Sequence, residues 1–461
     1  MPVNRKGSAL CVFVMALVSV SVRWWGLRRL KPLLGVTTRT ESTKQPPAVI
    51  EEEPHEIARG NDELRIKHDG RYSRRVGDSN RCSDLDMRLF DRGRACGPPM
   101  SSPCVDLSRC HGGDTAALPA VRDSHDSGMG GVKIYVFDSG CSLSDSGDLL
   151  FDGAEQDPHF IDWVFRKAAR EAGVLAPTYD SACLFVHVTR GEKEPCAVST
   201  PLWNSGVNHV MVDFGDQGRE GRPTVADSYA MDAASNMHSC AYRSGFDVSL
   251  PLAPERRFHT LAGIAPLDRR FFLTTKGTVY LSGHGSEERF SIAPLQDEAN
   301  GVIVSMHCFE NHGEHLLPEN TEYCQQLKET YSDHDFASLL NTTFGLVPAG
   351  RSPGTYRLAE VMGAGAIPVI VARDVVPPFS EQHDWAAFSF TFAPDQVGPD
   401  MMATLRAIPQ AQLEEMQRKS LEVYRKIFGT DDTLLGPSAF GPIADGLFNI
   451  LMRRIEHRGA G

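Results

Sequence analysis

Residues 341–371 read NTTFGLVPAGRSPGTYRLAEVMGAGAIPVIV. This stretch predicts a strand at 343–347, a loop rich in Gly and Pro, a helix at 356–363, a sharp turn, and a second strand at 367–371. Both strands are continuous apolar runs, which is typical of a parallel sheet covered on both faces. The stretch therefore predicts a unit in which strand, loop, helix and strand follow one another, as in nucleotide-binding α/β folds.

Similar apolar runs flank this unit on both sides. Strands are expected at 132–137, 182–188, 209–212, 271–274 and 301–305, and helices at 160–172 and 401–427. These strands are too many for one such sheet, and no repeat of 20 to 50 residues is visible. The fold class predicted is α/β, with two Rossmann-like halves.

Composition narrows the function class and the compartment. The 461 residues carry a formal net charge of -12, which disfavours a broad basic surface for nucleic acid. Ten of the eleven cysteines follow Cys11, an even number that permits disulfides in an oxidising compartment. Cys104 and Cys110 belong to no CxxC pair, so a disulfide role is favoured over zinc.

The N-terminus predicts a membrane anchor. Arg5 and Lys6 precede an apolar run at 8–22, and no small-residue cleavage site follows, so an uncleaved anchor at 8–30 is favoured over a cleaved signal peptide. More positive residues follow the run than precede it, which by itself would place the rest of the chain in the cytosol. The cysteines and the Asn341 glycosylation sequon favour the lumen instead.

Residues within 341–371 suggest a diphosphate site. Gly350 and Gly354 would let the backbone approach a ligand, with Arg351 beside the start of the following helix. Arg357 and Glu360 share one helix face, as a cation for phosphate and a carboxylate for ribose hydroxyls. The alternative is that Arg357 and Glu360 form a solvated surface pair and that the glycines only turn the chain.

Several motifs together strongly resemble the exostosin family of inverting glycosyltransferases, which includes the heparan sulfate co-polymerases. The resemblance covers residues 103 to about 428. Its ordered blocks are the collar at 103–110, LWNSGVNH at 202–209, GFDVSLPL at 245–252, TKGTVYLSG at 275–283 with Arg289 following, residues 341–371, and VPPFSEQHDW at 376–385.

The resemblance implies a GT-B architecture, in which two Rossmann-like domains face each other across a cleft. Its predicted divisions are a cytosolic tail at 1–7, the signal anchor at 8–30, a stem and cysteine-rich collar at 31–102, an acceptor domain at 103–265, a donor-binding domain at 266–395 and C-terminal helices at 396–461. It also implies a single-pass type II Golgi membrane protein, or one of the ER, with a lumenal catalytic domain. By the same resemblance, Arg351, Arg357 and Glu360 are expected to bind UDP, Arg289 to reach the same phosphates and Lys276 to lie at the cleft. Gly350 and Gly354 complete the predicted donor site.

The predicted function is inverting transfer of a sugar from a UDP-sugar to an oligo- or polysaccharide acceptor, with glucuronosyl transfer as the nearest likeness. Thr278, Val279, Ala349 and Ser352 stand where the heparan enzymes carry basic residues, and no counterpart of their second, metal-dependent domain is found. The alternatives are a catalytically silent subunit that stabilises an active partner in a homo- or hetero-oligomer, and a glycan-binding module. Retention of Arg357 and Glu360 favours the enzyme.

The catalytic base is predicted to be Asp180, with His209 and Asp213 as alternatives. Neither DxD triplet is interpreted as a metal site. Asp84 and Asp86 fall in the predicted stem, and Asp333 and Asp335 fall at the start of a predicted short helix, where carboxylates cap free N–H groups. The cluster of Cys308, His307, His312 and His315 is likewise interpreted as metal-free. No cofactor or metal is expected, and the UDP-sugar is a substrate.

Overall fold

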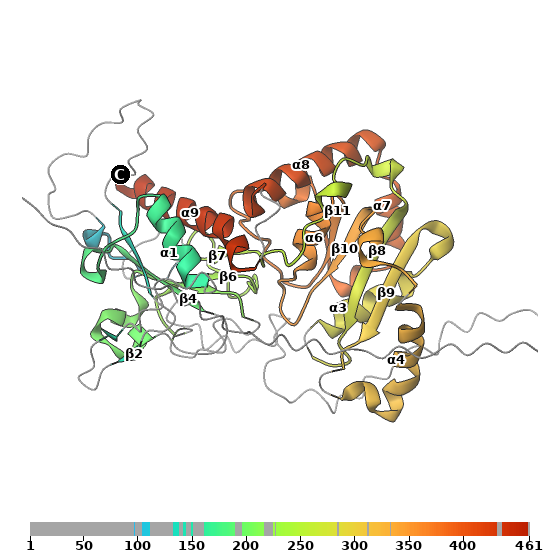
Figure 1. Ribbon diagram of the computed structural model, residues 1–461, viewed down its shortest axis with the longest axis horizontal. Coiled ribbons are helices and arrows are strands. Elements are labelled where there is room, and N and C mark those ends of the chain that lie inside the picture. Colours follow the sequence, from blue (N-terminus) through green and yellow to red (C-terminus); the bar gives the residue numbers. More distant parts are fainter. Residues whose placement is uncertain are drawn as a thin grey trace, which may run out of the picture. The chain divides into compact units, whose positions relative to one another are not determined.

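The computed structural model describes residues 96, 104–110, 132–137, 142–143, 149–150, 161–189, 196–215, 225, 227–283, 285–310, 313–331, 333–430 and 436–459. All of them belong to one compact unit, Asp69–Gly461. The unit contains two five-stranded sheets and one two-stranded sheet (Figure 1).

The first sheet is entirely parallel and has the strand order β1-β4-β5-β6-β7. Its strands are β1 (Ile134–Val136), β4 (Leu184–Thr189), β5 (His209–Asp213), β6 (Met231–Ala234) and β7 (Val248–Ser249), and a separate hairpin pairs β2 (Ser142–Leu143) with β3 (Leu149–Leu150). Helices α1 (Ile161–Glu171) and α9 (Gly441–Gly459) pack on each other. Phe165 of α1 meets Phe448 of α9 with ring centroids 6.0 Å apart, so the C-terminal helix completes the core of the first half.

The second sheet is also parallel and has the order β12-β11-β10-β8-β9. Its strands are β8 (Phe271–Val279), β9 (Val302–Cys308), β10 (Thr342–Pro348), β11 (Ile367–Val371) and β12 (Phe390–Phe392). The associated helices are α3 (Ser286–Ile292), α4 (Pro318–Tyr331), α5 (Phe336–Leu339), α6 (Arg357–Gly363), α7 (Pro399–Arg406) and α8 (Gln410–Phe428). Helix α6 packs on β10 and β11 and is covered by α8, while α4 packs on β9 (Figure 1).

The predicted pair of parallel α/β halves is confirmed, with differences in several elements. The helix expected at 401–427 is two helices, α7 and α8, because Pro409 lacks the N–H that a continuous helix needs and becomes the N-cap of α8. Strand β8 continues five residues beyond the expected end at Thr274, through Lys276 and Gly277 to Val279. Strands β6, β7 and β12 were not predicted, because they are short and lack a long apolar run.

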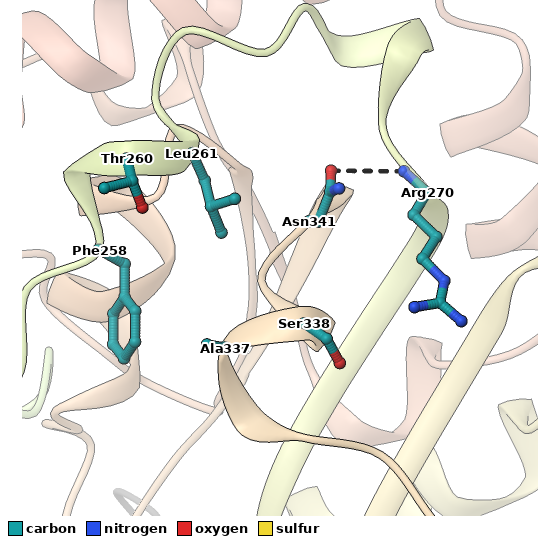
Figure 2. A pocket seen from close by; sticks show the side chains of 7 residues that line it. All are labelled: Phe258, Thr260, Leu261, Arg270, Ala337, Ser338 and Asn341. Atoms are coloured by element: carbon teal, nitrogen blue, oxygen red, sulfur yellow. Dashed lines mark hydrogen bonds between the residues drawn. The ribbon is translucent and has the colours of Figure 1, made fainter.

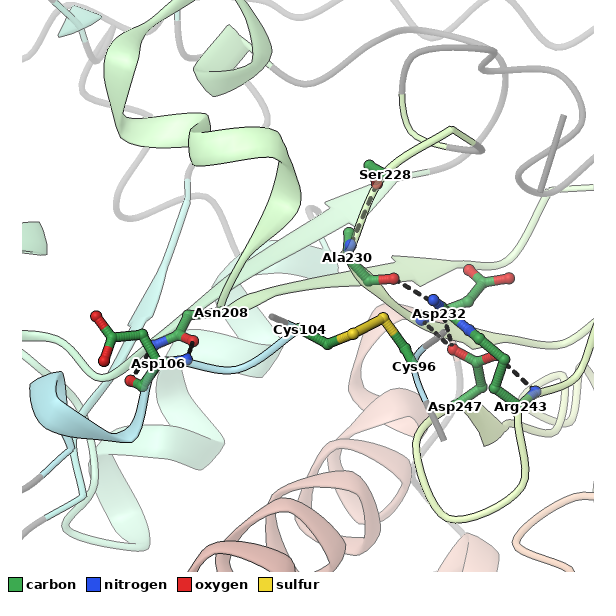
Figure 3. The surroundings of a disulfide bond; sticks show 9 residues. All are labelled: Cys96, Cys104, Asp106, Asn208, Ser228, Ala230, Asp232, Arg243 and Asp247. Carbon is green, nitrogen blue, oxygen red and sulfur yellow. Dashed lines mark hydrogen bonds and ion pairs between the residues drawn. A yellow bond between two sulfur atoms is a disulfide. The ribbon is translucent and has the colours of Figure 1, made fainter. Parts of the chain in front are cut away.

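One disulfide and one asparagine attach the cysteine-rich collar to the first sheet, and Figure 3 shows the asparagine, Asn208, beside Asp106. Cys104 pairs with Cys96, and Cys110 pairs with Cys183, the residue before β4. Asn208 accepts a hydrogen bond from the Asp106 N–H at 2.6 Å and donates from Nδ2 to the Asp106 carbonyl at 2.9 Å. The disulfide role predicted for Cys104 and Cys110 is confirmed, since their partners lie elsewhere in the chain.

The predicted anchor and stem, residues 8–30 and most of 31–102, lie outside the described residues. Within the part of the chain that is described, no helix is both long and apolar enough to cross a membrane.

Candidate functional site

Arg289 joins the ends of two neighbouring strands of the second sheet. It lies on α3 and is only 9% exposed. Its Nε donates to the Ala349 carbonyl, just after β10, at 3.1 Å, and its Nη1 donates to the Thr278 carbonyl near the end of β8. Burial lowers the pKa of this guanidinium, as does the nearby charge of Arg357, while Tyr280 and Glu288 oppose the shift. Arg289 is therefore held at the carboxyl edge of the sheet, where ligands of parallel α/β folds bind.

Arg357 and Glu360 form a buried ion pair on α6. Arg357 Nη1 lies 3.1 Å from Glu360 Oε2, and the two side chains are only 15% and 10% exposed. Burial lowers the pKa of Arg357 and raises the pKa of Glu360, while the mutual attraction of the two groups opposes both shifts. Arg357 Nη2 also donates to the Lys276 carbonyl, and its guanidinium lies 4.4 Å from the ring centroid of Phe336. The alternative of a solvated surface pair is therefore excluded.

The two arginines meet over Gly277 in β8. A Cβ added to Gly277 would lie 3.4 Å from Arg289 Nη1 and 3.9 Å from Arg357 Nη2. Two guanidiniums this close repel each other, and an opposite charge between them would stabilise both. Gly277 places no side chain between the two groups, whose nearest nitrogens donate to the carbonyls of Thr278 and Lys276. Segments far apart in the sequence thus bring two guanidiniums together, and Glu360 already pairs with one of them.

Two glycines in the loop after β10 have close backbone neighbours. An added Cβ at Gly354 would lie 2.1 Å from the Ser235 carbonyl oxygen, so this glycine permits a close approach to another backbone segment. At Gly350 it would lie 3.1 Å from the Gly354 carbonyl oxygen, so this glycine permits a tight turn within the loop. Helix α6 begins at Arg357 with Tyr356 as its N-cap, which confirms the helix expected at 356–363 to within one residue. Arg351 is exposed, with its guanidinium 5.8 Å from the ring centroid of Phe309.

Lys276 contributes to this cluster through its backbone. Its ammonium donates to the carbonyls of Tyr331 and His334 and lies 4.0 Å from the Tyr331 ring centroid. Desolvation lowers its pKa, while Asp335 and Asp333 raise it. The side chain is thus bound to the segment joining α4 and α5, while its carbonyl accepts from Arg357.

Two aromatic residues that the sequence patterns did not single out support the arginines. Tyr280 directly follows β8 and lies under Arg289, with 4.9 Å from the guanidinium to the ring centroid. Phe309 directly follows β9, and its ring meets Tyr280 edge to face at 5.4 Å. The Cys308–Cys324 disulfide fixes the residue before Phe309. An aromatic residue immediately after each strand is the signal that could have identified them.

Asn341 lies apart from this cluster. It precedes β10 at the amino edge of the sheet, whereas the arginines lie near the carboxyl edge. The residue is half-buried and lines a pocket (Figure 2).

The candidate bases in the first half differ in position and exposure. Asp180 is exposed in a short turn just before β4, at the amino edge of the sheet. His209 is 1% exposed, with Nδ1 2.8 Å from His187 Nε2 and Nε2 3.0 Å from the Leu202 carbonyl, and burial lowers its pKa to about 4. Both ring nitrogens of His209 are thus within hydrogen-bond distance of other groups in the fold. Asp213 is fully buried at the carboxyl end of β5 and accepts from the Gly215 N–H at 2.8 Å.

Of the two DxD triplets, the structure describes Asp333 and Asp335, which lie at the start of helix α5. Asp335 caps α5 by accepting the Ser338 N–H at 3.0 Å, as the sequence predicted, and Asp333 is exposed beside it. Asp84 and Asp86 lie outside the described residues. Across the described ranges, no group of three or more His, Cys, Asp or Glu side chains is placed to hold a metal ion.

The sequence profile of the family described as the Exostosin GT47 domain matches residues 167–408, more than half of the chain. This chain belongs to the exostosin family. The match begins within α1, takes in strands β4 to β12 and ends just after α7, and every residue of the Arg289 and Arg357 cluster falls within it.

Curated relatives of this exostosin-family chain are identical to it at about a quarter of the aligned positions. It is 28% identical to Exostosin-1 of Drosophila melanogaster over 250 residues, covering 51% of this chain and 32% of that protein. It is 27% identical to Exostosin-1a of Danio rerio over 345 residues, covering 70% of this chain and 45% of that protein. The chain thus spans about a third to a half of the length of these relatives.

Two solved structures are distantly similar. One is an α,α-trehalose-phosphate synthase (UDP-forming) from Burkholderia vietnamiensis, at 14% identity and a TM-score of 0.32 over 66% of this chain and 80% of that one. The other is a glycosyltransferase from Rickettsia africae, at 9% identity and a TM-score of 0.31 over 67% of this chain and 83% of that one.

Proposed function

We propose that this exostosin-family chain is an inverting glycosyltransferase that moves a sugar from a UDP-sugar onto a glycan acceptor. The observation that carries the proposal is the meeting of Arg289 and Arg357 over Gly277. A diphosphate leaving group would supply the anion that this arrangement favours, through charge-assisted hydrogen bonds. We further propose a GT-B architecture with the donor in the C-terminal half, which the two parallel α/β halves support.

Each residue of the cluster has a proposed role in transfer. Arg289 and Arg357 neutralise the diphosphate as charge develops on it in the transition state, and exposed Arg351 reaches the same phosphates. Glu360 uses Oε2 for Arg357, whereas its Oε1 accepts no hydrogen bond from the described part of the chain. That oxygen is proposed to accept a ribose hydroxyl. Glu360 would then bind the donor in the ground state as firmly as in the transition state.

The catalytic base is proposed to lie in the first half of the chain, where an acceptor hydroxyl would lose its proton. Asp180 has the exposure that a base needs but lies at the amino edge of its sheet. Asp213 lies at the carboxyl edge but is fully buried. Comparing kcat for Asp180→Asn and Asp213→Asn decides between them, because replacing the catalytic base should lower kcat far more than replacing the other aspartate.

The compartment and the donor sugar are also proposals. The disulfides Cys96–Cys104, Cys110–Cys183 and Cys308–Cys324 support a lumenal location, and we propose a Golgi or ER membrane protein anchored through residues 8–30. The sugar proposed for transfer is glucuronic acid, by resemblance to the heparan enzymes. Thr278 and Ala349 stand where the heparan enzymes carry basic residues, so this chain has fewer side-chain cations beside Arg289, and a uronic-acid donor has less support for that reason. Transfer is proposed to need no metal, and a homo- or hetero-oligomer is proposed as the working form.

Calorimetric titration of UDP into the full chain in detergent tests the proposal. Wild type should bind UDP, and a screen of UDP-sugars should identify one that is hydrolysed or transferred. Arg351→Ala should lower turnover more than affinity, since leaving-group charge appears in the transition state, and Glu360→Gln should do the reverse. If wild type binds no UDP, the catalytically silent subunit becomes the better interpretation.

A further inference from the structure

A pocket of about 280 Å³ lies beside Asn341 (Figure 2). Its walls include Phe258, Leu261, Arg270, Ala337, Ser338 and Asn341. Arg270 directly precedes β8 and Asn341 directly precedes β10, and because these strands are parallel, both residues lie at the amino edge of the second sheet. The pocket is therefore separate from the carboxyl edge that holds Arg289.

The amide of Asn341 is oriented with its nitrogen available. Its Oδ1 accepts the Arg270 N–H at 3.4 Å, and its Nδ2 makes no hydrogen bond within the described residues. The third residue of the sequon, Thr343, is buried and donates its hydroxyl to the Pro266 carbonyl at 2.6 Å. A glycosylating enzyme can reach this hydroxyl only before β10 joins the sheet, so any sugar is present while the pocket forms around it.

The walls of the pocket have the chemistry of a sugar-binding surface. Phe258 is steadied by Phe336, with ring centroids 5.4 Å apart, and Leu261 and Ala337 extend the apolar wall. Such a wall suits the C–H face of a pyranose ring and an acetamido methyl group. Arg270 has no carboxylate within salt-bridge distance in the described residues, so its guanidinium remains available for a hydroxyl or an amide carbonyl.

We propose that this pocket seats the first N-acetylglucosamine of a glycan linked to Asn341. In the linking step, Asn341 Nδ2 forms a bond to the anomeric carbon and loses one proton. The bond from that carbon to a lipid pyrophosphate donor breaks, and the pyrophosphate leaves with the electron pair and takes up the proton. A volume of about 280 Å³ is at the small end for ligand pockets, which fits one sugar unit with the remaining glycan in solvent.

Binding of the first sugar in this pocket requires a lumenal location but does not require the proposed transferase activity. The glycan would stabilise the amino edge of the second sheet, where Phe258 packs on Phe336, and would leave the carboxyl edge clear. Its failure is distinguishable from failure of the donor-site proposal, because UDP binding is not the readout.

The test uses the full chain produced in cells of a secretory-competent host. Mass spectrometry should find Asn341 occupied. Trimming the glycan to its first sugar with an endoglycosidase should leave Tm unchanged, while removing that sugar with an amidase should lower Tm by about 2–4 °C. Phe258→Leu should keep the fold yet speed native amidase release at least several-fold, and Thr260→Ala, a change at the exposed rim, should not.

A double-mutant comparison separates a seated sugar from general pocket damage. Phe258→Leu should lower Tm in the glycosylated chain but clearly less in the Asn341→Gln background, since groups in contact show coupled effects. Additive losses in Tm would overturn the proposal, as would an unmodified Asn341 in the cell-produced protein. Equal amidase release from wild type and Phe258→Leu would also contradict it.

Discussion

Gly277→Ala should abolish much of the UDP affinity without disturbing the fold. The new Cβ would lie 3.4 Å from Arg289 Nη1 and 3.9 Å from Arg357 Nη2, which are ordinary contact distances. Gly277 lies within β8 and is not among the glycines with positive φ, so alanine fits its backbone. At a compatible position this exchange commonly adds about 0.4–1 kcal/mol of stability. The methyl group instead occupies the space in which a phosphate oxygen would contact both guanidiniums.

The expected loss follows from the contacts that the methyl group displaces. A hydrogen bond to a charged group contributes about 1.5–3 kcal/mol. Losing one guanidinium contact should therefore weaken UDP binding about ten- to a hundredfold, at ~1.4 kcal/mol per decade. Calorimetric titration gives the affinity, and a thermal melt of the same sample shows that the variant is folded.

Gly263→Ala is the matched control, because nothing lies within 4 Å of the Cβ it would add. It should bind UDP like wild type. Undiminished UDP affinity in Gly277→Ala, with wild type binding UDP, would refute the idea that the diphosphate lies between Arg289 and Arg357.

Gly354→Ala should destabilise the fold by about 1–3 kcal/mol in denaturant unfolding, because its Cβ would lie 2.1 Å from the Ser235 carbonyl oxygen; a variant as stable as wild type would contradict this close approach. The pKa of His209 is about 4 in the folded state and about 6.5 in the unfolded state. Between these pH values the unfolded state binds more protons than the folded state. The free energy of unfolding therefore falls as the pH drops from 6.5 to 4, by about 3 kcal/mol in all. Urea unfolding at pH 7 and pH 4.5 should show this slope, and His209→Gln should flatten it. Transfer activity should survive a chelator and Asp333→Asn, whereas loss in chelator with recovery on adding Mn²⁺ would show that the chemistry needs a metal.

Much of the secondary structure could be predicted because it depends on local pattern. The run at Ile367–Val371 is apolar throughout and is observed as β11 with those bounds. The break before α8 was also present in the sequence as Pro409, and the long apolar periodicity on both sides hid it. Strand β6, Met231–Ala234, carries a charged residue and two alanines, so its strand state depends on pairing with β5 and β7.

In the candidate site, too, some features follow from local sequence pattern and others only from the tertiary structure. The spacing of Arg357 and Glu360 determined from the sequence alone that they share a helix face, because the helical period fixes neighbours three residues apart. That the pair is buried, and that Arg289 meets Arg357 over Gly277, was decided only by the tertiary structure. These groups come from segments 60 to 81 residues apart, as in the bonds from Arg289 to Ala349 and from Arg357 to Lys276. Contacts at such separations depend on the path of the whole chain through the parallel sheet, which no local period encodes.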